Sequence, residues 1–292
     1  MGQRLREILV DSRRIAVAQW GDLDGMPVLA LHGTPGSRFG RHPDEDAVRR
    51  IGARVITYDR PGYGGSDRLP GRRVVDCVTD VAAIADSLDL ERFAVTGASG
   101  GGPHALAVAA RLPHRITRAQ CVVGVAPFDA RGLDWFSGMD PLNVQEFGWA
   151  REGQGVLHRQ LEREAAEQLE RISVDPSKVL SDDWQLDSAD RQVLARPDVQ
   201  RVLTEMIREA FRPGVWGWVD DDLAFVQPWG FELSEIEAAV EVRYGTNDVL
   251  VPAAHGAWLA GNVPGAEVVV DEEAGHLAAP EKQLELLRRL VA

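Results

Sequence analysis

The most constraining feature of this sequence is a series of short apolar runs in which polar residues do not alternate. They are Arg14 to Trp20, Pro27 to Leu31, Arg54 to Tyr58, Phe93 to Thr96, Ala119 to Val125, Val240 to Tyr244 and Ala266 to Val270. Strands that are apolar on both sides are typical of a parallel sheet whose two faces are covered by helices. Helical periodicity lies between the runs, as in Val74 to Leu88 and Pro103 to Leu112. The sequence therefore predicts an α/β layer fold.

A long stretch without strand-like runs interrupts this alternation after the fifth run. From Pro127 to Asp222 the apolar residues follow helical spacing, as in Leu157 to Ile172 and Val199 to Ala210. We therefore expect one α/β core, residues 1–126 and 223–292, interrupted by a helical insertion at residues 127–222.

The insertion is acidic and rich in tryptophan. It holds 20 acidic and 11 basic residues, and five of the eight tryptophans of the chain. The rings are expected either to line an apolar substrate pocket or to attach the insertion to the core. Asp220 to Asp222, at its end, are expected to form a solvated hinge.

The overall composition excludes several classes of partner. The chain carries 45 acidic and 32 basic residues, a formal net charge of −13. Because nucleic-acid binding depends on clustered Lys and Arg, we expect no nucleic-acid partner. No apolar stretch approaches the roughly 20 residues that span a bilayer, and the charged first residues lack the apolar region of a signal peptide. We expect a cytoplasmic protein without a membrane partner; the sequence leaves the oligomeric state open.

The two cysteines, Cys77 and Cys121, lie far apart in the sequence. They form neither a disulfide framework nor a metal-ligand pattern, so we expect two buried free thiols and no metal site.

The most informative motif is a G-x-S-x-G sequence between a strand and a helix. Residues 93–110 read FAVTGASGGGPHALAVAA, with Ser99 at the centre of Gly97-Ala98-Ser99-Gly100-Gly101. A strand that turns directly into a helix holds the serine in a strained conformation and exposes its side chain above the sheet. Small residues on either side let the strand and the helix pass closely. Ser99 is therefore predicted to be a nucleophile, with the N–H of Gly100 directed at a developing oxyanion.

A serine nucleophile needs a base and a carboxylate that orients the base. His276 directly follows the last predicted strand, and active sites of open α/β sheets form at such carboxyl ends. Asp248 follows the preceding strand, so the order Ser99, Asp248, His276 fits the motif. Asp129 is the rival carboxylate. His32 also follows a strand, but we expect it to shape its own loop.

With these residues in place, the chain resembles a serine-type α/β-hydrolase, of the esterase and proline-iminopeptidase-like branch. Five motifs carry the resemblance: His32-Gly33-Thr34-Pro35-Gly36, Asp59 to Ser66, the serine motif, Gly245-Thr246-Asn247-Asp248 and Gly275-His276. The resemblance implies an eight-stranded, mostly parallel sheet flanked by helices, a helical lid after the sixth strand, and no cofactor. It also implies an oxyanion hole made by the backbone N–H groups of Thr34 and Gly100.

The expected activity is hydrolysis of a carboxylic ester, or a related acyl bond, of a small and apolar substrate. The His-Gly-Thr-Pro-Gly segment is similar to a loop of proline iminopeptidases, which makes an aminopeptidase or amidase the first alternative. The serine motif lacks the tryptophan that those enzymes usually carry after the serine. A slow ligand receptor or an inactive interaction protein is the alternative from another class, and the same residues also suit C–C bond hydrolases and acyltransferases.

Overall fold

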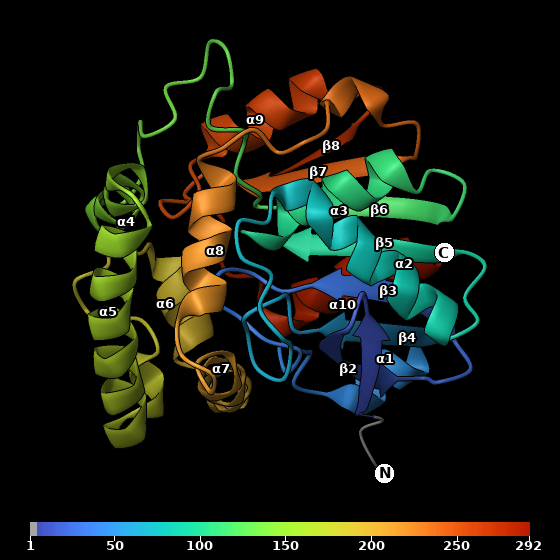
Figure 1. Ribbon diagram of the computed structural model, residues 1–292, viewed down its shortest axis with the longest axis horizontal. Helices are drawn as coiled ribbons and strands as arrows, with labels where there is room; N and C mark the ends of the chain where they lie inside the picture. The colour runs from blue at the N-terminus through green and yellow to red at the C-terminus, as the bar shows by residue number, and fades with distance from the viewer. Residues whose placement is uncertain (1–4) are drawn as a thin grey trace.

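The computed structural model describes residues 5–292 and is centred on an eight-stranded sheet (Figure 1). In chain order its strands are β1 Arg6–Val10, β2 Arg13–Gly21, β3 Met26–Leu31, β4 Ala53–Tyr58, β5 Phe93–Ala98, β6 Ile116–Val122, β7 Val240–Gly245 and β8 Glu267–Asp271. Across the sheet they lie in the order β1-β2-β4-β3-β5-β6-β7-β8. The pairs β1–β2 and β2–β4 are antiparallel, and the other pairs are parallel. The predicted α/β fold with a mostly parallel eight-stranded sheet is confirmed.

Two strands differ from the sequence prediction. The sequence did not predict β1, because Arg6–Val10 is a largely exposed edge strand and lacks the apolar run of a buried one. Strand β6 starts at Ile116 and ends at Val122, whereas the prediction was Ala119 to Val125. Val123 adopts a φ of 45°, which ends the extended conformation there.

Helices cover both faces of the sheet, as buried parallel strands require. Helices α2 (Cys77–Ser87), preceded by the 3-10 turn η1 (Val74–Asp76), α3 (Gly101–Arg111) and α9 (Ala253–Asn262) pack in one large core with the strands. Figure 1 shows α2 and α3 in front of the sheet and α10 (Pro280–Val291) behind it. The short helix α1 (Glu45–Arg50) shares a smaller cluster with α10.

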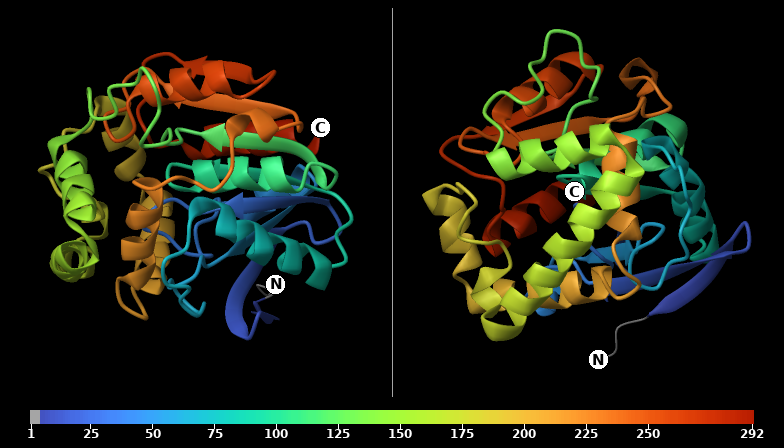
Figure 2. Two further views of the ribbon diagram at one scale, coloured as in Figure 1. Left: turned by 45° about the horizontal axis from the view of Figure 1, so that its top comes forward. Right: turned by 60° about the vertical axis from the view of Figure 1, so that its left-hand side comes forward.

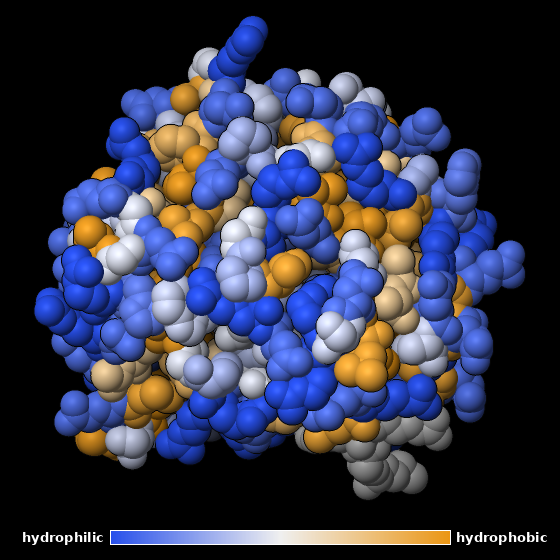
Figure 3. Space-filling view, viewed as in Figure 1, coloured by the Kyte–Doolittle hydropathy of each residue, from blue (hydrophilic) through white to orange (hydrophobic). Residues whose placement is uncertain are grey.

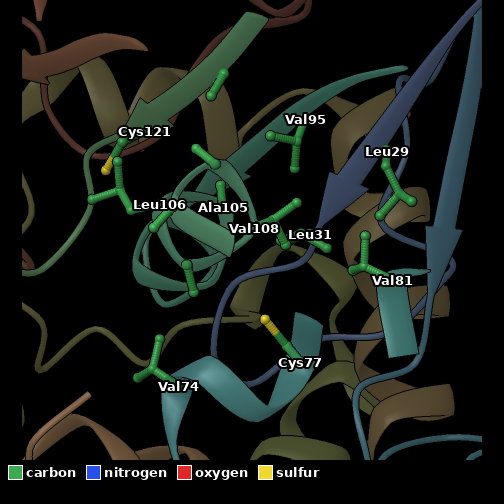
Figure 4. Packing of buried hydrophobic residues seen from close by; sticks show 14 of the residues in the cluster. Leu29, Leu31, Val74, Cys77, Val81, Val95, Ala105, Leu106, Val108 and Cys121 are labelled. Atoms are coloured by element: carbon green, nitrogen blue, oxygen red, sulfur yellow. The ribbon is translucent and has the colours of Figure 1, made fainter. Parts of the chain in front are cut away.

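The main core lies between α3 and the central strands. Residues Gly101 to Ala110 of α3 are all buried. Figure 4 shows Leu106 and Val108 of this helix in the same cluster as Leu31 and Cys121 of the strands. Both cysteines are buried and free, as predicted.

Five helices lie between β6 and β7. They are α4 Pro141–Glu152, α5 Gln154–Val174, α6 Ser188–Leu194, α7 Pro197–Ala210 and α8 Trp216–Phe225, with the 3-10 turn η2 (Pro176–Lys178) after α5 and η3 (Leu233–Glu235) after α8. We call α4 to α8 the helical segment; Figures 1 and 2 show it gathered at one end of the strands. It encloses a second apolar core that includes Leu157, Leu161 and Ile207. The predicted helices at 157–172 and 199–210 are α5 and α7. The division into core and cap at residues 127–222 stays a prediction. Helix α8 ends at Phe225, three residues beyond the predicted end of the insertion.

The surface shown in Figure 3 is predominantly hydrophilic, with apolar residues in small groups separated by polar ones. Among residues 5–292, no helix combines the length and the apolar composition needed to cross a bilayer.

Candidate active site

Ser99 lies on a sharp turn between β5 and α3. Its φ is +54°, a left-handed conformation that costs a non-glycine residue about 1–2 kcal/mol. Two backbone bonds hold the turn: Ser99 N–H donates to Val122 O, and Gly102 N–H donates to Ser99 O, both at 2.9 Å. The geometry is that of the strained strand-to-helix turn that the sequence predicts.

The glycines of the motif are required by close backbone contacts. A Cβ on Gly97 would lie 2.0 Å from Gly101 O, and a Cβ on Gly101 would lie 2.2 Å from Leu31 O. Helix α3 therefore passes too close to β5 for a side chain at Gly97 and too close to β3 for a side chain at Gly101, in agreement with the close strand–helix passage that the sequence predicts.

His276 and Asp248 meet in the loops that follow β8 and β7. His276 Nδ1 donates to Asp248 Oδ2 at 2.7 Å, which leaves Nε2 free to accept a proton. The other oxygen, Oδ1, accepts from the N–H groups of Leu250 and Val251 at 2.9 Å, so the carboxylate is fixed by the turn in which it lies.

The surroundings of His276 favour its protonated form. Burial lowers the pKa of the imidazole, but the charge and hydrogen bond of Asp248 and the charge of Asp190 outweigh it, and the pKa is raised above its usual value. The rival Asp129 is exposed, and the carboxylate on His276 Nδ1 is Asp248.

Ser99 and His276 line the same cavity, of about 360 Å³. Among residues 5–292, no side-chain hydrogen bond joins Ser99 Oγ to His276. Such bonds are often formed only when substrate is bound. None of the described residues that line the cavity is a tryptophan. Trp135 instead packs edge-on against Phe128 and Phe147 in the main core, which favours attachment over a role in the pocket.

Thr34 and Gly100 are neighbours beside Ser99. A Cβ on Gly100 would lie 2.4 Å from Thr34 Oγ1, and a Cβ on Gly33 would lie 3.5 Å from the Cβ of Ser99. Within the described part of the chain, neither the N–H of Thr34 nor that of Gly100 has a hydrogen-bond acceptor. Two free donors therefore lie next to the serine.

His32 holds the loop that carries Thr34. Its Nδ1 donates to Gly33 O at 2.7 Å, and its Nε2 accepts from Arg60 N–H at 3.1 Å. Both ring nitrogens are thus engaged by the backbone. This agrees with the loop-shaping role expected for this histidine.

The profile of the family described as alpha/beta hydrolase fold matches residues 26–283. The chain belongs to this family. The predicted resemblance is therefore confirmed.

Other members of the alpha/beta hydrolase fold family differ in how much of the chain they match. A 2-hydroxy-6-oxononadienedioate/2-hydroxy-6-oxononatrienedioate hydrolase of Cupriavidus pinatubonensis is 25% identical over 86% of this chain and 80% of its own length. A proline iminopeptidase of Xylella fastidiosa is 31% identical over 43% of this chain and 41% of its own length. The chain spans about two fifths of the length of several such relatives.

A solved structure shows the same fold over nearly the whole chain. An alpha/beta hydrolase fold protein from Nakamurella multipartita is 26% identical, covers 97% of this chain and 99% of its own, and superposes with a TM-score of 0.67. Together with the family profile, these relatives support an enzyme of the hydrolase type, as the sequence predicts.

In this member of the family, Asp190 holds the His276 loop and was missed by the sequence analysis. It belongs to α6, and it accepts from His276 N–H at 2.9 Å and from Leu277 N–H at 2.7 Å. The carboxylate is fully buried, and burial raises its pKa against the effect of these two bonds. No motif marks it, because its partners are 86 and 87 residues away in the chain.

Asp221 is a residue for which the sequence prediction is wrong. The expected solvated hinge at Asp220 to Asp222 is wrong: these side chains are 2%, 0% and 1% exposed. Asp221 lies 2.6 Å from both Arg60 Nη2 and Arg72 Nη1, and it accepts from Thr34 Oγ1 at 2.7 Å. Burial raises the pKa of this carboxyl, but the two arginines outweigh burial and hold the pKa well below its usual range.

The Asp221 cluster supports the loop beside Ser99. Arg60 donates to the carbonyl oxygens of His32 and Gly33 and to Thr34 Oγ1. A carboxylate of α8 thus fixes, through Arg60, the backbone from which the N–H of Thr34 projects.

Among residues 5–292, two other carboxyl groups of the helical segment, the half-buried Glu146 and the buried Asp222, form no ion pair with a basic side chain. Glu146 of α4 accepts from Trp218 Nε1 at 2.7 Å, and burial raises its pKa to about 7. Asp222 is 1% exposed, and burial and the charge of Glu146 raise its pKa well above the usual value. This part of the segment therefore favours protonated carboxyl groups.

The described residues form no candidate metal site. Across residues 5–292, no group of three or more His, Cys, Asp and Glu side chains is placed to hold one.

Proposed function

We propose that this chain is a serine hydrolase that cleaves a carboxylic ester, or a related acyl bond, of a small and apolar substrate. The observation that carries the proposal is the position of His276, bonded to Asp248 through Nδ1 at 2.7 Å and facing the cavity that Ser99 lines. A histidine that is oriented by a carboxylate and shares a cavity with a strained serine is the arrangement that nucleophilic acyl transfer requires.

In the first half of the reaction, Ser99 Oγ attacks the carbonyl carbon of the ester while His276 Nε2 takes the hydroxyl proton. Asp248 keeps the proton on Nδ1 and stabilises the imidazolium that forms. The free N–H groups of Thr34 and Gly100 stabilise the negative charge on the carbonyl oxygen. The C–O bond then breaks, and the alcohol leaves with the proton from His276.

In the second half, water releases the acyl group from Ser99. His276 takes a proton from the water, the hydroxide adds to the acyl carbon, and Ser99 Oγ leaves with that proton. No step needs a cofactor or a metal. The helical segment acts as a cap over the carboxyl ends of the strands, and the bonds of Asp190 and Asp221 to the core loops support this role.

The test is turnover of p-nitrophenyl acetate and butyrate by the purified chain and by the Ser99→Ala variant. The variant is expected to lose at least about 10⁴-fold in kcat. Ser137→Ala is the matched control, because Ser137 is exposed. Circular dichroism checks that each variant is folded. Undiminished activity of Ser99→Ala would refute the assignment.

Two further measurements separate the alternatives. Faster turnover of amino-acid p-nitroanilides than of esters would indicate the aminopeptidase activity that the similarity to the iminopeptidase suggests. Stoichiometric labelling of Ser99 by a fluorophosphonate, without turnover of any ester or anilide, would indicate a slow receptor instead.

A further inference from the structure

The cavity beside Ser99 continues inward along one face of the sheet. Ala98 and Thr96 of β5 line it, together with Val122 of β6 and Ala30 of β3. Residues two apart on a strand point to the same face, so Ala98 and Thr96 form a continuous wall. The cavity therefore leads away from the serine and into the space between the sheet and α10.

Apolar side chains of two helices line much of the rest of the cavity. They are Val202, Leu203 and Met206 of α7 and Leu286 and Leu290 of α10. Leu290 also packs in a cluster with Val28 and Ala94, which are both fully buried and do not line the cavity, so we place the inner end of the cavity at Leu290. The space exists because Ala30 and Ala98 occupy strand positions where a larger side chain would fill it.

The polar side chains along the cavity are already bonded within the protein. Thr96 Oγ1 donates to Gln120 Oε1 at 3.4 Å, and Gln120 Nε2 donates to Leu286 O at 3.1 Å. Arg41 is paired with Glu205 at 2.5 Å, and His42 Nε2 is bonded to Pro280 O at 3.0 Å. The polar side chains left to contact a substrate are therefore Ser99 and His276, at the mouth of the cavity.

The depth of the cavity fixes the length of its occupant. Thr96 is the β5 residue furthest from Ser99 that lines the cavity, and the three residue steps between them span at most about 10 Å at the rise of a strand. An extended polypeptide residue has three backbone bonds and spans about 3.5 Å, so an extended chain covers about 1.2 Å per bond. About eight bonds therefore reach from the serine to the level of Thr96, and the next residue on that face of β5, Ala94, is already packed in the cluster with Leu290.

We propose that this cavity is an acyl-chain pocket, and that the preferred substrate is an ester of an unbranched, uncharged acyl group of about eight carbons. This inference rests on the proposed function and adds its substrate class. The carbonyl carbon lies at Ser99, the alkyl chain extends between the sheet and α10, and the alcohol portion stays outside.

The experiment measures kcat/KM for p-nitrophenyl esters with acyl chains of two, four, eight, twelve and sixteen carbons. Burial of one methylene corresponds to at most about a fourfold gain. We expect at least about a tenfold rise from the acetate to the octanoate, and a fall for chains that exceed the pocket. A flat profile, or one that is highest for acetate, would overturn the pocket assignment.

Two variants narrow the cavity from opposite walls. Ala30→Leu acts from β3 and Val202→Phe from α7, and each is expected to lower the octanoate-to-acetate ratio of kcat/KM by at least about tenfold. Two independent positions keep the test valid if one variant does not fold. Ala166→Leu on the exposed side of α5 is the matched control and is expected to leave the ratio unchanged. A ratio unchanged in both cavity variants would refute the pocket.

Failure of the proposed function has a different signature. In that case no ester of any length is turned over, and an octyl fluorophosphonate does not label Ser99. Turnover of short esters without a gain for longer ones leaves the serine hydrolase standing and refutes only the acyl-chain pocket.

Discussion

Replacement of Asp221 by asparagine is expected to destabilise the protein strongly. The side chains of Asp221, Arg60 and Arg72 are 0%, 0% and 3% exposed, and the carboxylate lies 2.6 Å from each guanidinium. The amide of the Asp221→Asn variant would keep the volume and one acceptor oxygen but remove the negative charge that the two arginines share. Loss of one partner of a buried ion pair typically costs about 3–5 kcal/mol, because the remaining charge is left uncompensated. We expect the free energy of unfolding to fall by that amount.

The assay is urea and thermal unfolding, followed by far-ultraviolet circular dichroism. At about 2–4 °C per kcal/mol, the Tm is expected to fall by about 6–20 °C. Asp86→Asn is the matched control, because Asp86 is 69% exposed and pairs with Arg115 at the surface. That change is expected to cost about 0–1 kcal/mol.

The pH dependence gives an independent check. Because the pKa of Asp221 is held well below its usual range, its stabilisation is present above the unfolded pKa of about 3.9 and is lost as the pH falls through the folded value. The difference between the protein and Asp221→Asn is therefore expected to be constant from about pH 5 to 8 and to shrink in stronger acid. A loss below about 1 kcal/mol at neutral pH, equal to that of Asp86→Asn, would refute the reasoning.

Three further predictions concern other titratable groups. His276 must be neutral to act as a base, so kcat/KM is expected to fall as the pH drops through its raised pKa. Asp248→Asn is expected to move the midpoint of this fall to lower pH. A pH–rate profile that the substitution leaves unchanged would contradict the assignment. Asp190→Asn removes the charge that helps to raise the pKa of His276, so we expect a lower midpoint. It also removes one of the two oxygens that hold the His276 loop, so we expect about a tenfold lower kcat from a less well placed imidazole, and a loss of kcat without a shift of the midpoint would mean a purely structural role. Glu146 prefers its proton in the folded state, so its stabilising effect is complete below its unfolded pKa and is lost as the pH rises through about 7. Glu146→Gln is therefore expected to gain up to about 3 kcal/mol over the unmodified protein between pH 5 and pH 8, measured by urea unfolding, and equal pH curves would exclude the effect.

The sequence predicted the features whose causes are local. The strand β5, the turn at Ser99 and the start of α3 follow one another within a few residues, so their steric demands are visible in the motif itself. His276 and Asp248 could be located because each comes directly after a strand of a parallel sheet, and the carboxyl ends of such strands lie along one edge.

The features that the sequence did not predict depend on distant partners. Three consecutive aspartates look solvated when only their neighbours are considered, but Asp221 meets Arg60, which is 161 residues away. Asp190 binds the backbone of the His276 loop, and backbone groups carry no sequence signal. The Ser99 cavity depends on small side chains on two strands, β3 and β5, that face α7 and α10. A linear pattern of apolar residues does not distinguish a filled space from an open one.

The carboxylates of Asp190 and Asp221 have a consequence for engineering by exchange of modules. Both belong to the helical segment, yet their partners are loops of the α/β core. A helical segment taken from another family member and grafted onto this core would have to bring carboxylates to both places, or it would leave two buried guanidinium groups and the His276 loop unsupported. The side-chain hydrogen bonds of α5, such as that of Gln168 to Val179 O, stay within the helical segment. Diversification of sequence is therefore best confined to α5, with α6 and α8 kept as part of the scaffold.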